Sequence, residues 1–224
     1  GFISKDKKIS IKFILLYLML MVPIFLIWLW FPLVGLIFFL VYSAWHFGQT
    51  DIEQWKISSK WVGFTWGSCL LSYLFLTHIP EFKTVLLALN VKEVLNFESF
   101  FLLKHFIIGL CFLLAVFYKK AEWLLLVTFL FFAQYVNLIF AFGLYFIFHH
   151  SRLGWLHLRK SLAISNLKMY VLALPFNIGA VALFYLFFTN FELSLNQNIA
   201  YFFIFLSCIS FPHVLSMGVF YREK

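Results

Sequence analysis

Four histidines of this chain lie at the ends or in the interior of long apolar segments. Ionisable groups at membrane depth are costly to bury, so they are candidates for a functional site by default. Neutral imidazoles with no cysteine and few carboxylates nearby are suitable ligands for iron, zinc or copper. The sequence therefore indicates a metal centre built from histidines. The candidate ligands are His46, His150 and His213, with His149 as an alternative.

A simpler interpretation is open to each of the histidines taken alone. A histidine at the end of a span can be an interfacial side chain, as tyrosine and tryptophan often are. We assign His78 to this class because Pro80 ends its helix, and His157 because it lies in a basic loop. His105, beside Lys104, faces either the bundle or a lipid headgroup.

Asp51 follows His46 by five residues and has two interpretations. It orients the His46 ring by accepting a hydrogen bond from the second ring nitrogen, as carboxylates beside metal sites commonly do. Alternatively, it is a solvated carboxylate in a loop. The sequence leaves both open.

The elements that carry these residues are predicted to be membrane-spanning helices. Of the 224 residues, 64% are hydrophobic and 12% are charged, which is more apolar surface than a water-soluble core of this size buries. The apolar runs do not alternate with polar residues, so they fit helices and not barrel strands. We assign the net charge of +8 to cytoplasmic loops and not to nucleic-acid binding. The three cysteines are predicted to be packing residues.

The chain is predicted to be one all-α domain, residues 1–224, that forms a polytopic bundle of seven or eight transmembrane helices. Residues 81–99 mix charges with leucines and predict an interfacial amphipathic helix. Residues 123–150 form an apolar stretch of roughly 42 Å, too long for one simple span and too short for two. The other predicted spans are residues 11–30, 32–48, 61–78, 100–118, 169–188 and 198–220.

A break in the stretch 123–150 is predicted from the positive charges, which gather on the cytoplasmic side of membrane proteins. With one lysine unassigned, a single crossing divides the lysines and arginines eight against eight, whereas a broken helix that returns divides them fourteen against two. Gln134 and Asn137 mark the expected break. The same break brings His46 and His150 to one side, with His213 within reach. We therefore expect a discontinuous helix.

An ordered set of residues in this chain resembles the Brp/Blh family of bacterial and archaeal membrane carotenoid dioxygenases. The resemblance covers about residues 10–220 and rests on the order of the motifs along successive spans. The set consists of His46-Phe47-Gly48 with Asp51, then Tyr145 and His150-Ser151 closing a span, then Pro212-His213-Val214-Leu215.

Two features depart from the family pattern. The family has an earlier helix with a Gly-x-x-His-Gly-x-x-Asp motif whose histidine is a presumed iron ligand. Nothing here matches it, and we expect that an amino-terminal helix is missing, since the chain begins with Gly1. Many members also have a second histidine one helical turn after the His-Ser histidine. Gly154 stands there, so His149, His157 or His213 replaces it, or the metal site is reduced.

The resemblance implies cleavage of β-carotene by O₂ at a non-haem Fe(II), giving two molecules of retinal. It implies that His46 and His150 hold the iron as the catalytic residues, with His213 as a third ligand or a supporting group. It also implies a multi-pass protein of the prokaryotic cell membrane. Its partners would be an apolar carotenoid, O₂, the lipid bilayer and a retinal-accepting rhodopsin.

Two other functions remain open from the sequence. In a transporter or channel, a broken helix forms the binding site and polar residues line a path; against this, the chain has no inverted repeat and no intramembrane carboxylates for ion coupling. A non-catalytic membrane subunit that binds carotenoid or retinal is the second alternative. The residues that would line the transport path are His46, Gln134, Asn137, His150 and Asn177.

Overall fold

A computed structural model describes residues 11–91, 101–189 and 194–222, and within these ranges the chain is helical with short connections and no strand. The predicted all-α fold is confirmed. The three cysteines are buried, as expected for packing residues. The elements are α1 (Ile11–Trp30), α2 (Pro32–Gln54), α3 (Lys60–Thr77), α4 (Ile79–Ala88), α5 (Phe101–Phe117), α6 (Ala121–Ala133), α7 (Leu138–Leu144), the π-helix η2 (Tyr145–Ser151), α8 (Arg152–Leu162), α9 (Asn166–Thr189) and α10 (Leu195–Arg222).

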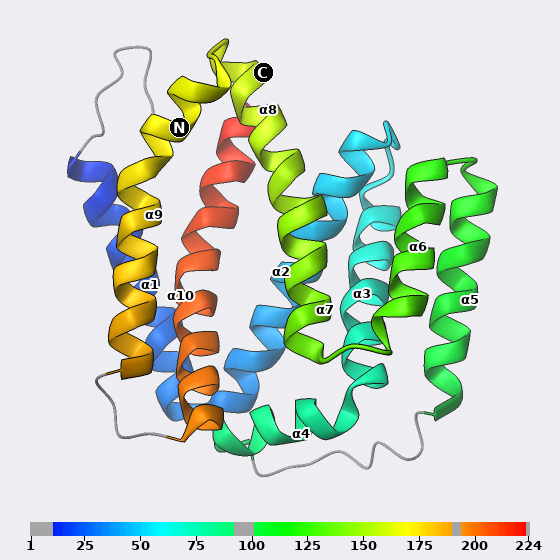
Figure 1. Ribbon diagram of the computed structural model, residues 1–224, viewed down its shortest axis with the longest axis horizontal. Coiled ribbons are helices and arrows are strands. Elements are labelled where there is room, and N and C mark those ends of the chain that lie inside the picture. The colour runs from blue at the N-terminus through cyan, green and yellow to red at the C-terminus, as the bar shows by residue number, and fades with distance from the viewer. Residues whose placement is uncertain (1–10, 92–100, 190–193, 223–224) are drawn as a thin grey trace.

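The long helices run in alternating directions, so their connections gather at two ends of a bundle (Figure 1). The α2–α3, α5–α6 and α8–α9 connections lie at one end, and α4 lies at the other. Positive charge follows this division, as the predicted topology requires. The first three connections and the helix turns beside them carry Lys56, Lys60, Lys119, Lys120, Arg159, Lys160 and Lys168.

The predicted break in the stretch 123–150 is confirmed. Helix α6 ends at Ala133, α7 begins at Leu138, and the chain reverses direction between them (Figure 1). Asn137 caps α7 by accepting a hydrogen bond from the Phe140 amide at 2.8 Å, and Gln134 donates to a carbonyl of its own turn at 2.9 Å. Both amides therefore serve the turn itself, whereas the transporter hypothesis placed them along a path.

The bend between α3 and α4 holds this break in place. His78 is buried, with its Nε2 2.7 Å from the carbonyl oxygen of Val136. The Glu81 carboxylate accepts a hydrogen bond from the Leu138 amide at 2.6 Å and so satisfies a free N–H at the start of α7. The interpretation of His78 as an interfacial side chain is wrong, because its ring bridges the bend to the hairpin.

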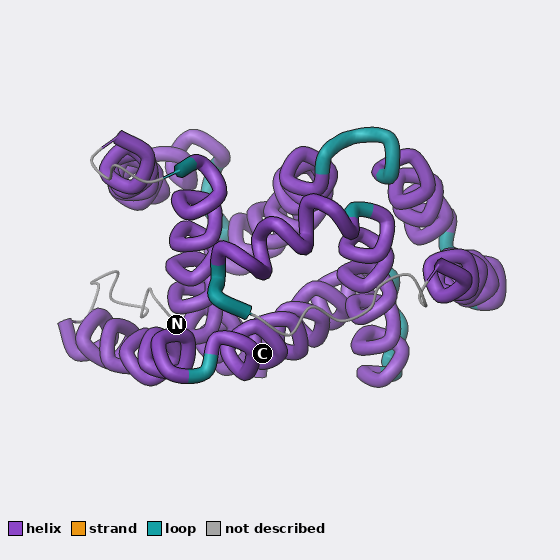
Figure 2. The backbone as a smooth tube through the Cα atoms, turned by 90° about the horizontal axis from the view of Figure 1, so that it is seen from below, coloured by secondary structure: helices purple, strands orange, loops and turns teal. Residues whose placement is uncertain are grey.

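Helix α4 lies across the end of the bundle at 94° to α3 (Figure 2). Pro80 occupies its first turn, where the missing N–H would have no helical partner anyway. The amphipathic helix predicted over residues 81–99 thus begins earlier, at Ile79, and extends to Ala88. Residues 92–100 lie outside the described part of the chain.

Several described helices are suited to a membrane. Pro32–Gln54 and Asn196–Ser216 are long and apolar enough to cross one, and the bent pair α3 and α4 is a third candidate if taken as one span. Three further apolar helices are shorter, and large apolar side chains such as Met19 and Phe117 point outward. The total of seven or eight spans stays a prediction.

The helix that carries His46 packs closely against α3. Ala44 and Gly48 on α2 face Gly63 and Gly67 on α3. A Cβ on Gly48 would overlap the Gly63 carbonyl oxygen, and one on Gly67 would overlap the Ala44 carbonyl oxygen. Small residues four positions apart let helix backbones approach in membranes. Gly48, two residues after His46, is therefore needed for space.

A buried polar cluster aligns α10 with α1 and α2. Trp28 Nε1 donates to the Ser207 hydroxyl at 2.9 Å, and the Tyr42 hydroxyl donates to the Ser207 carbonyl oxygen at 2.7 Å. Tyr42 lies about one turn before His46, and Ser207 precedes His213 on α10. These bonds therefore fix the relative heights of the two histidines.

Candidate metal centre

Three segments of the bundle bring the rings of His46, His150 and His213 together. They belong to α2, to η2 and to α10. The ring centres of His46 and His150 are 5.0 Å apart, and those of His46 and His213 are 5.6 Å apart, with the rings nearly perpendicular in both pairs. The three ligands predicted from the sequence thus form one cluster with His46 at its centre.

The pair His46 and His150 fits a metal ion. Two imidazoles bound through nitrogens about 2 Å from one ion place their ring centres about 5 Å apart. His150 Nδ1 is buried without a hydrogen-bond partner, which leaves a polar atom in need of one. Within the described residues, no three His, Cys, Asp or Glu side chains are close enough to hold an ion together. As placed, the three histidines therefore do not form a complete three-ligand site.

The cluster is walled by aromatic side chains on one side and open on the other. The Phe47 and Phe146 rings lie 4.6 Å and 5.5 Å from the ring centre of His150. His150 is buried, His46 is partly buried and His213 is exposed. A bound ion would thus have an apolar wall behind it and access from the His213 side.

His150 lies in a π-helix, which the sequence did not indicate. π-turns are rare and occur frequently at functional sites. Their wider turn changes the angular position of each side chain from that in an ordinary α-helix. Here His149 reaches Asp51 and His150 lies against His46. No glycine or proline interrupts Tyr145–Ser151, so the usual signal of an irregular helix is missing.

Asp51 is fully buried and accepts hydrogen bonds from three side chains. Trp66 Nε1 donates at 2.7 Å, the Tyr145 hydroxyl at 3.1 Å and His149 Nε2 at 2.9 Å. The interpretation of Asp51 as a solvated carboxylate is wrong. The other interpretation predicted a hydrogen bond to His46, but the histidine that donates to Asp51 is His149, the alternative ligand.

Many family members have a second histidine at the position of Gly154, where this chain has no side chain. Gly154 lies on α8, and no atom of the surroundings falls within 4 Å of a Cβ built there. Of the three proposed replacements, His149 is hydrogen-bonded to Asp51, His157 lies on the same helix as Gly154, and His213 contacts the His46 ring. His213 is therefore the replacement that the geometry favours.

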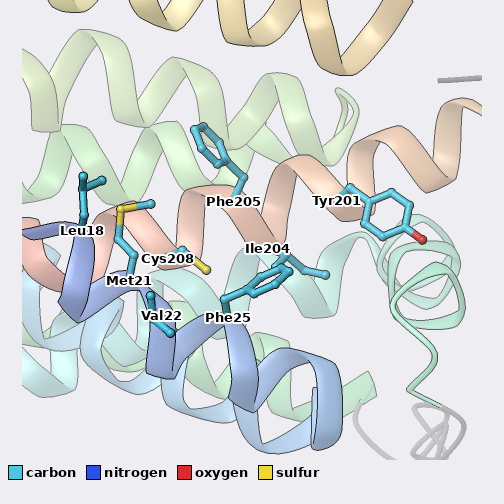
Figure 3. Close-up of a pocket in the computed structure, with 8 residues that line it drawn as sticks. All are labelled: Leu18, Met21, Val22, Phe25, Tyr201, Ile204, Phe205 and Cys208. Carbon is cyan, nitrogen blue, oxygen red and sulfur yellow. The ribbon is translucent and has the colours of Figure 1, made fainter. Parts of the chain in front are cut away.

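An apolar groove of about 430 Å³ lies between α1 and α10 (Figure 3). It shares α10 with His213, but none of the three clustered histidines lines it. The groove is therefore an apolar feature separate from the three clustered histidines. Its lining consists of Leu18, Met21, Val22, Phe25, Tyr201, Ile204, Phe205 and Cys208.

One family of known proteins matches almost the whole chain. The family model described as Beta-carotene 15,15'-dioxygenase matches residues 4–221, a range that includes the clustered histidines and the broken helix. Comparisons with curated proteins and with solved structures found no significant match. The match agrees with the family that the sequence motifs resemble. The chain therefore belongs to the beta-carotene 15,15'-dioxygenase family.

Proposed function

We propose that this protein is a multi-pass membrane enzyme that cleaves β-carotene with O₂ at a non-haem Fe(II) held by His46 and His150. His213 is the third ligand or supports the other two. Membership of the dioxygenase family supports the reaction. The observation that carries the site is the contact of imidazole rings from three separate segments, with one buried ring nitrogen unpartnered.

In the proposed reaction the central double bond of β-carotene breaks, and each of its two carbons receives one oxygen atom of O₂. Two molecules of retinal account for all atoms, and a retinal-accepting rhodopsin is the proposed acceptor. Bound Fe(II) would supply the activation of O₂. His46 and His150 would hold the ion through neutral ring nitrogens. The buried Phe47 ring would keep water from the buried side.

The carotenoid is proposed to arrive from the bilayer. Apolar side chains cover the outside of the described helices, and His213 is exposed. An apolar polyene partitions into lipid and not into water, so a route through the aqueous phase is unnecessary. The side of the cluster that carries His213 is the proposed entry to the iron.

Product analysis tests the proposed function. The protein is purified in nanodiscs, depleted of metal, reloaded with Fe(II) without oxygen, and then exposed to β-carotene and O₂. We expect about two retinal molecules per carotene consumed, and none from the metal-free protein. A product other than retinal, or equal turnover without metal, would contradict the proposal. Carotenoid binding with neither iron nor turnover would favour the non-catalytic subunit.

The proposed topology predicts the labelling of single introduced cysteines. The end of the bundle that carries the α2–α3, α5–α6 and α8–α9 connections is positively charged and should face the cytoplasm. Helix α4 should face the opposite side. Lys119→Cys and Arg159→Cys should react with an impermeant maleimide only after the cells are opened. Thr84→Cys on α4 should react in intact spheroplasts. Labelling of Lys119→Cys and Thr84→Cys from the same side would contradict this arrangement.

A further inference from the structure

Asp51 connects three segments around the metal cluster. The carboxylate comes from α2, Trp66 from α3, and Tyr145 and His149 from η2. The two bonds to η2 reach its first residue and the residue directly before His150. The carboxylate therefore contacts the π-helix at its first residue and again at its fifth.

These hydrogen bonds contribute more to stability than hydrogen bonds at an aqueous surface do. A fully buried carboxylate is unfavourable unless its oxygens accept hydrogen bonds. Bonds to an ionised acceptor are stronger than neutral ones. Trp66 Nε1 can only donate, so this donor ties the carboxylate to α3. Asp51 is therefore fixed by its position on α2 and by its bond to α3. Its other two hydrogen bonds restrain the π-helix.

The choice between His149 and His150 depends on the turn of η2. Neighbouring residues of a helix point in directions about 100° apart, so only one of the two can face His46. Relaxation of the π-turn to an ordinary α-helix would change the direction of every side chain after Tyr145. The structure has His149 on Asp51 and His150 against His46.

We propose that Asp51 is a positioning residue that clamps η2 through Tyr145 and His149 and so turns His150 toward the metal. His149 is then an anchor and not a ligand. The positioning role rests on the proposed function, since it concerns a metal site. The clamp itself requires no metal.

The test compares Asp51→Asn with Glu53→Gln. The asparagine in Asp51→Asn would have an uncharged amide with only one acceptor oxygen. Its NH₂ group would face a position where Trp66 or the η2 side chains now donate to a carboxylate oxygen. Glu53 is an exposed carboxylate on the same helix, so Glu53→Gln removes the same charge without touching the clamp. Tyr145→Phe removes one donor only and gives a milder variant if Asp51→Asn does not fold.

Two measurements are made on the folded proteins. Hydrogen exchange of the metal-free protein reports on the clamp: in Asp51→Asn, amides of residues 145–151 should exchange about tenfold faster or more, with a smaller increase in Tyr145→Phe. Titration with Fe(II) reports on positioning: affinity should fall about 10–100-fold. Glu53→Gln should match the wild type in both measurements.

The outcomes are distinguishable. Unchanged exchange over residues 145–151 in both Asp51→Asn and Tyr145→Phe would overturn the clamp. Faster exchange with unchanged Fe(II) affinity would overturn the positioning role. A wild-type protein that binds no iron would overturn the proposed function and the positioning role together, whereas the exchange data would still decide the clamp.

Discussion

Replacing His46 by alanine is expected to abolish both Fe(II) binding and retinal formation. His46 is the central ring of the cluster, in contact with both His150 and His213. Loss of a supporting residue beside a metal site lowers affinity or activity about 10–100-fold, so loss of the central ligand should lower retinal formation by roughly a hundredfold or more. Iron content per chain and the initial rate of retinal formation are the measurements.

His105→Ala on α5 is the matched control, because it also removes a histidine from an apolar helix. It should keep the iron content and rate of the wild type. His150→Ala should resemble His46→Ala. His213→Ala should lose less, since its ring is more exposed and farther from His46. Retinal formation by His46→Ala at the wild-type rate would mean that the iron, if present, lies elsewhere.

Gly48→Ala is expected to destabilise the fold strongly. The added Cβ would overlap a backbone carbonyl oxygen of Gly63, which cannot move aside as the end of a flexible side chain can. Overpacking in a close-packed interior costs about 1–3 kcal/mol, and a backbone clash belongs at the upper end or above. The measurement is the thermal unfolding midpoint in detergent, with the yield of monodisperse protein.

Gly109→Ala provides the comparison, since nothing lies within 4 Å of a Cβ at that position. Alanine also has the higher helix propensity, so this variant should be as stable as the wild type or slightly more so. If Gly48→Ala were as stable as Gly109→Ala, α2 and α3 would not approach as closely as described. His46 would then also be placed differently.

The sequence predicted the main course of the chain well. Apolar length located the helices, and the first helix has the predicted bounds. The break between Ala133 and Leu138 followed from the distribution of positive charge, because topology depends on a sum over the whole chain. Local features were harder. The role of His78 depends on Val136, a residue far along the chain, which no local pattern reveals.

The sequence predicted that the three ligand histidines would lie together but not how their surroundings are arranged. Spans that share a depth can bring His46, His150 and His213 together, and the structure has their rings in contact. The partners of Asp51 could not be predicted, because they come from α3 and from a π-turn with no glycine or proline to mark it. Without that turn, the sequence named His150 as the ligand but left His149 as an alternative.

The central claim is that His46 and His150 bind the same iron ion. Pulsed electron paramagnetic resonance of the Fe(II)–nitric oxide form measures the nitrogen couplings of bound imidazoles directly. The account predicts imidazole couplings in the wild type that are lost together with the bound iron in both His46→Ala and His150→Ala, and are unchanged in His105→Ala. Iron bound without imidazole couplings, or with couplings unaffected by both substitutions, would contradict the account.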